Sequence, residues 1–224
     1  MSTAHAARIL LGKELRLEFR TRELLTTTVI FALVVVVLFS YAFDPTSAES
    51  RRYGPGLLWI AFLFAGSLML NPSFAREQSN DTLDALRMAP VSSFAILLGK
   101  ILANFIYMAI AEIILVPVFG VLYNVSLSGV VGRLILVLVL GTLGLVVTGT
   151  VFSAVSAHAR MRELLLPLLL LPILAPLLIA AVEATSSLLA DPPELDVTWV
   201  AFLAGFDTVF LTASWLLCDY LVEE

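Results

Sequence analysis

The stretch Leu24–Phe43 reads LLTTTVIFALVVVVLFSYAF and contains no charged residue. A helix needs about 20 mostly apolar residues, at about 1.5 Å each, to cross the roughly 30 Å hydrocarbon core of a bilayer. This stretch therefore predicts a membrane-spanning helix. It follows a charged segment and is too long for the apolar part of a signal peptide, so we expect it to remain in the protein.

Further apolar stretches of similar length follow along the chain. The sequence is 60% hydrophobic and 14% charged, with a mean hydropathy of +0.99. Soluble domains carry about a quarter charged residues, so this surplus of apolar side chains predicts contact with lipid. We expect an all-α integral membrane protein, a single transmembrane domain over residues 1–224, with six spans: Leu24–Phe43, Leu57–Phe74, about Leu97–Leu122 within Phe94–Tyr123, Leu134–Ala157, Leu164–Val182 and Thr198–Leu221.

The basic residues predict the orientation, because Lys and Arg are enriched in cytoplasmic segments. With both termini in the cytoplasm, ten of the 13 basic residues lie inside. The inner residues are Arg8, Lys13, Arg16, Arg20, Arg22, Arg76, Arg87, Lys100, Arg160 and Arg162, and the outer ones are Arg51, Arg52 and Arg133. We therefore expect a multi-pass protein of the plasma (inner) membrane.

The segment His5–Glu23 precedes the first span. Leu11, Leu15 and Phe19 share one helical stripe, whereas Lys13, Arg16 and Arg20 share another, although Glu14 and Glu18 interrupt the apolar side. Such a pattern favours a helix lying in the headgroup layer, and the alternative is a simple positively charged anchor.

Few residues suggest chemistry. Cys218 is the single cysteine, and neither His5 nor His158 has a partner at metal-ligand spacing, so we predict no catalytic and no metal site. The phosphate-binding pattern G-x-x-x-x-G-K-[ST] is absent, so any ATP is used by another protein. We expect no nucleic-acid partner. The tryptophans Trp59, Trp199 and Trp215 are expected near span ends, as interface anchors.

The inner segment between the second and third spans reads FAREQSNDTLDALRMAP over residues 74–90. Asp81 or Thr82 suits the beginning of a short helix, Asp84 suits its first turn, and Pro90 ends it. Leu83 and Leu86 share one face. An apolar face on a short cytoplasmic helix indicates docking, either into a partner protein or onto the bundle itself.

Two further features lie inside the spans. Gly149, Ser153 and Ala157, with Gly141 and Gly144, let helices approach closely, within the chain or across a dimer. Glu112 and Asp207 fall near the middles of the third and sixth spans, where a carboxyl group is costly and faces a bundle interior or a cavity. They form a possible intramembrane polar site, and a structural hydrogen bond is the alternative.

Residues 74–90, with Gly99-Lys100 and the six-span layout, resemble the CcmB family, the permease subunits of the ABC transporter of cytochrome c maturation. The family pattern F-x-x-[acid]-x-x-x-G-[ST]-L-[acid]-x-L-x-x-x-P is met except at Asp81, where the family has glycine. The matching residues are Phe74, Glu77, Thr82, Leu83, Asp84, Leu86 and Pro90.

The resemblance implies a cytoplasmic ABC ATPase partner that docks on Glu77, Asp81, Thr82, Leu83, Asp84, Leu86 and Pro90. It also implies a second copy of the chain and a separate haem-handling membrane protein. Haem is then expected as transported cargo or as a ligand held by a partner, because no histidine, a common axial ligand of haem, lies in the expected spans or outer loops. ATP is expected on the partner, so this chain is not itself an enzyme.

Three other functions are compatible with six spans. The chain would otherwise be an ABC-2 exporter permease for a drug, lipid or polysaccharide, or a membrane assembly scaffold without transport. An intramembrane serine protease would need a G-x-S-x-G-like turn and an intramembrane histidine, and neither is present.

Overall fold

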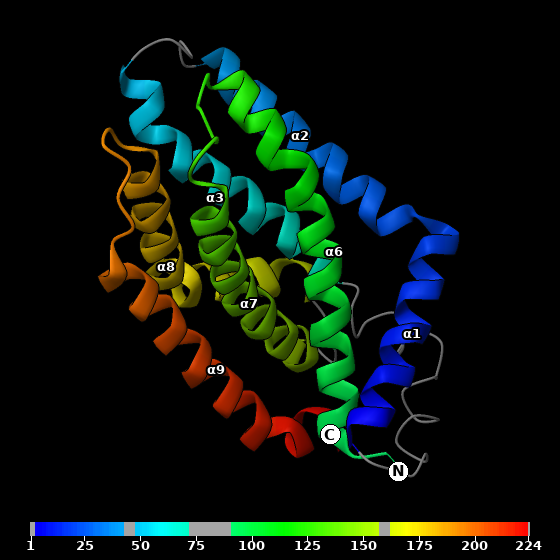
Figure 1. Cartoon of the computed structure of the whole chain (residues 1–224). Coiled ribbons are helices and arrows are strands. Elements are labelled where there is room, and N and C mark those ends of the chain that lie inside the picture. Colours follow the sequence, from blue (N-terminus) through cyan, green and yellow to red (C-terminus); the bar gives the residue numbers. More distant parts are fainter. Residues whose placement is uncertain (1–2, 43–47, 72–90, 157–161, 224) are drawn as a thin grey trace.

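The computed structural model describes residues 3–42, 48–71, 91–156 and 162–223 (Figure 1). Within these ranges every regular element is an α helix, and six helices are long and apolar enough to cross a membrane. This confirms the predicted all-α membrane fold. The elements are α1 (Thr3–Thr21), α2 (Glu23–Ala42), α3 (Ala48–Leu70), α6 (Ser93–Leu122), α7 (Val131–Ser156), α8 (Arg162–Leu189) and α9 (Val197–Glu223).

Two span boundaries differ most from the sequence prediction. α3 begins at Ala48 rather than Leu57, and α8 continues to Leu189 rather than Val182. Charged residues lower the apolar character of these ends without interrupting the backbone hydrogen bonds. Pro55 lies inside α3, where a single proline removes only one helical hydrogen bond.

α7 is the central helix of the bundle. It packs against α3, α6, α8 and α9, and Figure 1 shows it between α6 and α8. A Cβ atom at Gly141 would lie 2.2 Å from Trp59 Cη2, and one at Gly149 would lie 2.3 Å from Leu70 Cδ1. Gly141 and Gly149 therefore serve close packing within the chain, against α3.

Trp59 lies in the core, so the prediction of an interface anchor is wrong for this residue. Its side chain is 1% exposed, and its Nε1–H donates to Thr185 Oγ1 of α8 at 2.9 Å. Its ring also meets Phe62 edge-on, with the centroids 5.5 Å apart. Because α3 begins nine residues earlier than predicted, Trp59 falls within the helix instead of near its end.

The chain turns from α1 to α2 at a single residue. Arg22 takes the left-handed conformation with φ of 55°, and its N–H donates to the Glu18 carbonyl at 2.6 Å. The buried Glu18 side chain accepts a 2.8 Å hydrogen bond from the Leu25 N–H, in the first turn of α2. Glu18 thus fulfils the role of an N-cap for α2 from within α1.

Candidate functional site: the α1–α6 junction and the buried polar groups

The predicted docking segment lies outside the described residues, which include none of positions 72–90. The roles of Glu77, Asp81, Thr82, Leu83, Asp84, Leu86 and Pro90 stay predictions. The structure does describe where α6 begins after this segment. Ser92 is its N-cap, with its Oγ accepting from the Ala95 N–H at 3.4 Å.

α6 is longer than a membrane requires. Its 30 residues extend over about 45 Å, whereas the hydrocarbon core is about 30 Å thick. The part after Lys100 contains no basic residue and is by itself long enough to cross. Because basic residues favour the membrane surface, we expect the membrane boundary near Lys100 and the first two turns of α6 at headgroup level.

α1 packs against these first turns of α6, as Figure 1 shows at the end of the bundle where both termini lie. A Cβ atom at Gly99 would lie 2.9 Å from Leu10 Cβ and 3.3 Å from the Ala7 carbonyl oxygen. Ala6, Ala7 and Ala95 form a small buried cluster beside this contact. Small residues on both helices thus let the two backbones approach closely.

An ion pair joins the same two helices. Lys100 Nζ lies 3.4 Å from Glu14 Oε1, and the Lys100 side chain is only 4% exposed. Lys13 Nζ is 3.5 Å from the same carboxylate oxygen. The Gly99-Lys100 pair that resembles the family pattern is therefore part of the contact surface for α1.

The sequence prediction missed the use of both acidic residues of α1. Glu14 and Glu18 looked like interruptions of an apolar stripe, but one pairs with Lys100 and the other caps α2. Leu11 and Leu15 of the predicted apolar stripe pack against the core of the bundle, whereas Phe19 is 55% exposed. Glu14 and Lys100 are 86 residues apart, so no local pattern pointed to their pairing.

A charge-exchange experiment tests this ion pair. We expect Lys100→Glu to lower the free energy of unfolding by about 3 kcal/mol, because it places two carboxylates together at a mostly buried site. The double variant Lys100→Glu with Glu14→Lys should recover a substantial part of that loss. Thermal unfolding of the detergent-purified chain measures both. A double variant no better than Lys100→Glu alone would show that the pair does not hold α1.

Polar groups continue along α6 on the side that faces α7. Asn104 Nδ2 donates to Thr150 Oγ1 at 3.1 Å, and Thr142 Oγ1 donates to Glu112 Oε1. Asn104 and Glu112 are eight residues apart and point about 80° apart around α6, so both reach α7, whereas Lys100 points about 120° away from Glu112, toward α1. The spacing of Asn104 and Glu112 is a signal in the sequence that the prediction did not use.

Asp207 is placed differently from Glu112. Its side chain is 3% exposed, and neither carboxyl oxygen has a hydrogen-bond partner among the residues that the structure describes. A Cβ atom at Gly144 would lie 2.6 Å from Asp207 Oδ1. Thr142 and Gly144 point about 200° apart around α7. The two acidic residues therefore contact different sides of this helix and do not form one joint site.

This difference predicts opposite effects on stability. Glu112→Ala removes the acceptor of the Thr142 hydroxyl in a buried place, which should cost about 1–3 kcal/mol. Asp207→Ala removes a buried polar group without a partner, so the melting temperature should stay unchanged or rise. Thermal melts of both variants in the same detergent measure this. A strongly destabilised Asp207→Ala chain would mean that Asp207 has a stabilising contact.

A groove opens between α3 and α8 near the other end of the bundle. Its volume is about 640 Å³, and it is lined by residues that include Arg52, Tyr53, Glu183 and Asp191. A smaller pocket of about 200 Å³, lined by Ile60 and Ile179 among others, shares Glu183 with it. This side of the molecule therefore combines an apolar surface with charges of both signs.

Within residues 3–42, 48–71, 91–156 and 162–223, no three His, Cys, Asp or Glu side chains come together in a way that would hold a metal ion.

The fold and these contacts define a helical membrane protein with several spans, in which the N-terminal helix α1 packs against the third span, α6. Residues 5–217 match the profile of the family described as CcmB protein. The chain is similar to heme exporter protein B of Pseudomonas aeruginosa, with 31% identity over 88% of each chain. It is also similar to the proteins of that name from Paracoccus denitrificans, with 32% identity over 92% of this chain and 93% of the relative, and Rhodobacter capsulatus, with 34% identity over 79% and 80%. The chain belongs to the CcmB protein family.

Proposed function

We propose that this chain is the membrane permease subunit of an ATP-driven ABC transporter complex that exports or delivers haem for cytochrome c biogenesis. The observation that carries this proposal is the family match over residues 5–217, together with relatives named heme exporter protein B that align over most of their length. In this proposal residues 1–224 form a single ABC-2-type transmembrane domain in the inner membrane, with both termini in the cytoplasm.

The mechanism begins at a partner ATPase. ATP binding closes the ATPase, which moves the segment around Glu77–Pro90 that docks on it. α6 begins directly after this segment. α1 packs against α6 at Gly99 and pairs with it through the Lys100–Glu14 ion pair. Glu18 in turn joins α1 to the first turn of α2. A displacement of the docking segment is therefore passed to the third span, to α1 and to the first span together.

The groove between α3 and α8 is the surface where we place a second copy of the chain. Arg52 lies in the same groove as Glu183 and Asp191. In a dimer with a two-fold axis, Arg52 of each copy can therefore face the carboxylates of the other copy. Exposed apolar side chains such as Phe64 and Leu171 lie on the same two helices. A complex of this kind has two permease subunits and two ATPase subunits.

Haem enters this proposal as cargo or as the ligand of a partner, a separate haem-handling membrane protein. The groove is lined by two carboxylates and one guanidinium group, which does not suit the anionic propionates of haem. The chain's own part is then mechanical: its helices transmit the ATPase motion to a partner that holds haem.

Affinity purification of the tagged chain from its own membranes tests the proposal. The expected co-purifying proteins are an ATPase with a P-loop and a haem-handling membrane protein, and a strain lacking the chain should fail to mature c-type cytochromes. An ATPase without a haem protein would favour the exporter of another cargo. An intact complex without any ATPase would favour an assembly scaffold and contradict the proposal.

A further inference from the structure

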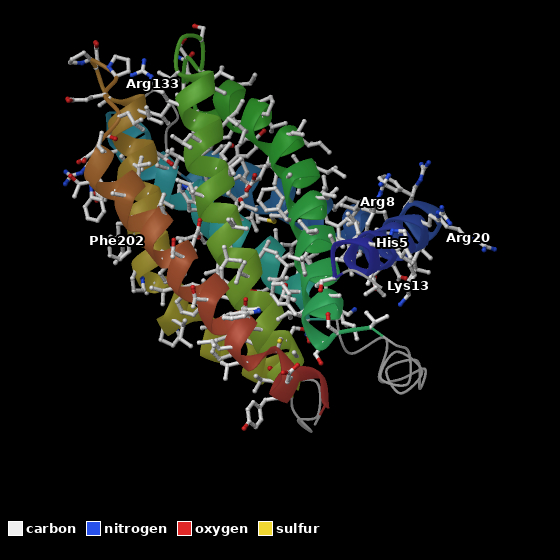
Figure 2. All side chains as sticks on the ribbon, turned by 60° about the horizontal axis from the view of Figure 1, so that its bottom comes forward. His5, Arg8, Lys13, Arg20, Arg133 and Phe202 are labelled. Atoms are coloured by element: carbon white, nitrogen blue, oxygen red, sulfur yellow. The ribbon has the colours of Figure 1, made fainter. Side chains whose placement is uncertain are left out.

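The charges of α1 are sorted between its two sides. Arg8, Lys13, Arg16 and Arg20 are exposed, whereas Glu14 and Glu18 turn toward α6 and α2. Figure 2 shows Arg8, Lys13 and Arg20 gathered on α1 at the flank of the bundle, far from Arg133. The side of α1 that faces away from the bundle, here the outer face, thus carries mainly positive charge.

Apolar side chains accompany these charges. Ile9 is 52% exposed and Phe19 is 55% exposed, and both lie on the outer face beside the basic residues. Gly12 lies between them, and a Cβ atom there would meet nothing within 4 Å. An exposed aromatic ring among arginines is unfavourable in water but suits the boundary between headgroups and acyl chains.

The position of α1 in the bilayer follows from its anchor. It packs on α6 between Ala95 and Lys100, the part of α6 that we expect at headgroup level. Arg8 and Arg20 are twelve residues apart, which corresponds to roughly 18 Å along the helix. The outer face can therefore contact several lipid headgroups at once, at the depth where their phosphates lie.

We propose that the outer face of α1, formed by Arg8, Lys13, Arg16 and Arg20 with Ile9 and Phe19, binds the phosphate groups of anionic phospholipids. Basic residues near a membrane surface each strengthen the attraction to anionic lipid, and Ile9 and Phe19 insert into the acyl boundary. An acidic surface of the partner ATPase is the competing occupant, but it would not account for two exposed apolar side chains at this depth.

The experiment measures which lipid is enriched beside α1. A fluorophore is attached to Gly12→Cys in a Cys218→Ser background, and the full chain is reconstituted in phosphatidylcholine nanodiscs. Equal amounts of headgroup-spin-labelled phosphatidylglycerol or phosphatidylcholine are added, and the ratio of quenching by the two lipids gives the local enrichment. We expect about fivefold or greater enrichment of phosphatidylglycerol, the factor expected from a single well-placed basic residue.

Matched variants locate the effect. The triple variant Arg8→Gln, Arg16→Gln, Arg20→Gln should bring the ratio near one, whereas the same three changes to Lys, or Arg133→Gln, should preserve it. If the triple variant fails to insert, the ratio for the parent chain should still fall toward one in 1 M salt, a condition that screens charges beyond about 3 Å.

A ratio near one for the parent chain without added salt would overturn the proposal. So would enrichment that persists in the Gln variant, or a fluorophore that responds to purified ATPase and not to lipid charge. None of these measurements depends on haem export.

Discussion

Replacing Leu86 by Asp is expected to abolish maturation of c-type cytochromes while the chain still inserts into the membrane. Leu83 and Leu86 share one face of the short helix predicted within residues 74–90. In the proposed complex this face docks into the partner ATPase, where a buried and unpaired carboxylate is strongly unfavourable. Haem staining of c-type cytochromes and the ATPase rate of the purified complex, measured together, give the two readouts.

Two controls separate docking from folding. Leu86→Met keeps an apolar side chain of similar volume and should retain most of the activity. Gln78→Asp adds the same charge at a position outside the predicted apolar face and should have a small effect. Normal cytochrome maturation by the Leu86→Asp chain would contradict the docking role of this segment, whatever the result for the other proposals.

The second large effect is expected at Gly141. A Cβ atom there would lie 2.2 Å from the Trp59 ring, which is buried and donates to Thr185. Gly141→Ala should therefore displace Trp59, lose its hydrogen bond and separate α3 from α7. Overpacking of this kind costs about 1–3 kcal/mol, and a larger residue such as Leu should prevent stable folding. The melting temperature of the detergent-purified chain reports the loss.

Gly205→Ala is the matched control for this prediction. Gly205 also lies inside a spanning helix, α9, but a Cβ atom there would meet nothing within 4 Å. Alanine favours the helix by about 0.5–1 kcal/mol over glycine, so this variant should be as stable as the parent or more stable. Equal melting temperatures for both variants would show that α3 and α7 do not pack as described.

Local sequence patterns predicted the spans because each span is determined by its own composition. A run such as Leu24–Phe43 is apolar whatever its neighbours are, and the structure places α2 over Glu23–Ala42. The predictions were weaker at the ends of α3 and α8, where charged residues continue a helix beyond its apolar part. Hydropathy measures a preference for lipid and says nothing about where backbone hydrogen bonding stops.

The contacts between helices were much less predictable. Glu14 appeared to be a defect in an amphipathic pattern until the structure placed Lys100 beside it. Trp59 appeared to belong at an interface because tryptophan often lies there, but the glycine at position 141 opens a place for its ring in the core. Such pairings join residues far apart in the sequence, so they can be predicted only once the arrangement of the helices is known.

The pairing of polar groups between α6 and α7 bears on how the chain is made. These two helices are consecutive spans, and Asn104 and Glu112 of the first find Thr150 and Thr142 of the second. During synthesis, the hairpin can leave the insertion machinery as one unit, with its polar side chains already matched and hidden from lipid. Asp207 emerges last, in α9, when the helix against which it packs is already in place. The order of the spans along the chain thus gives Asn104, Glu112 and Asp207 an adjoining helix as soon as each is inserted.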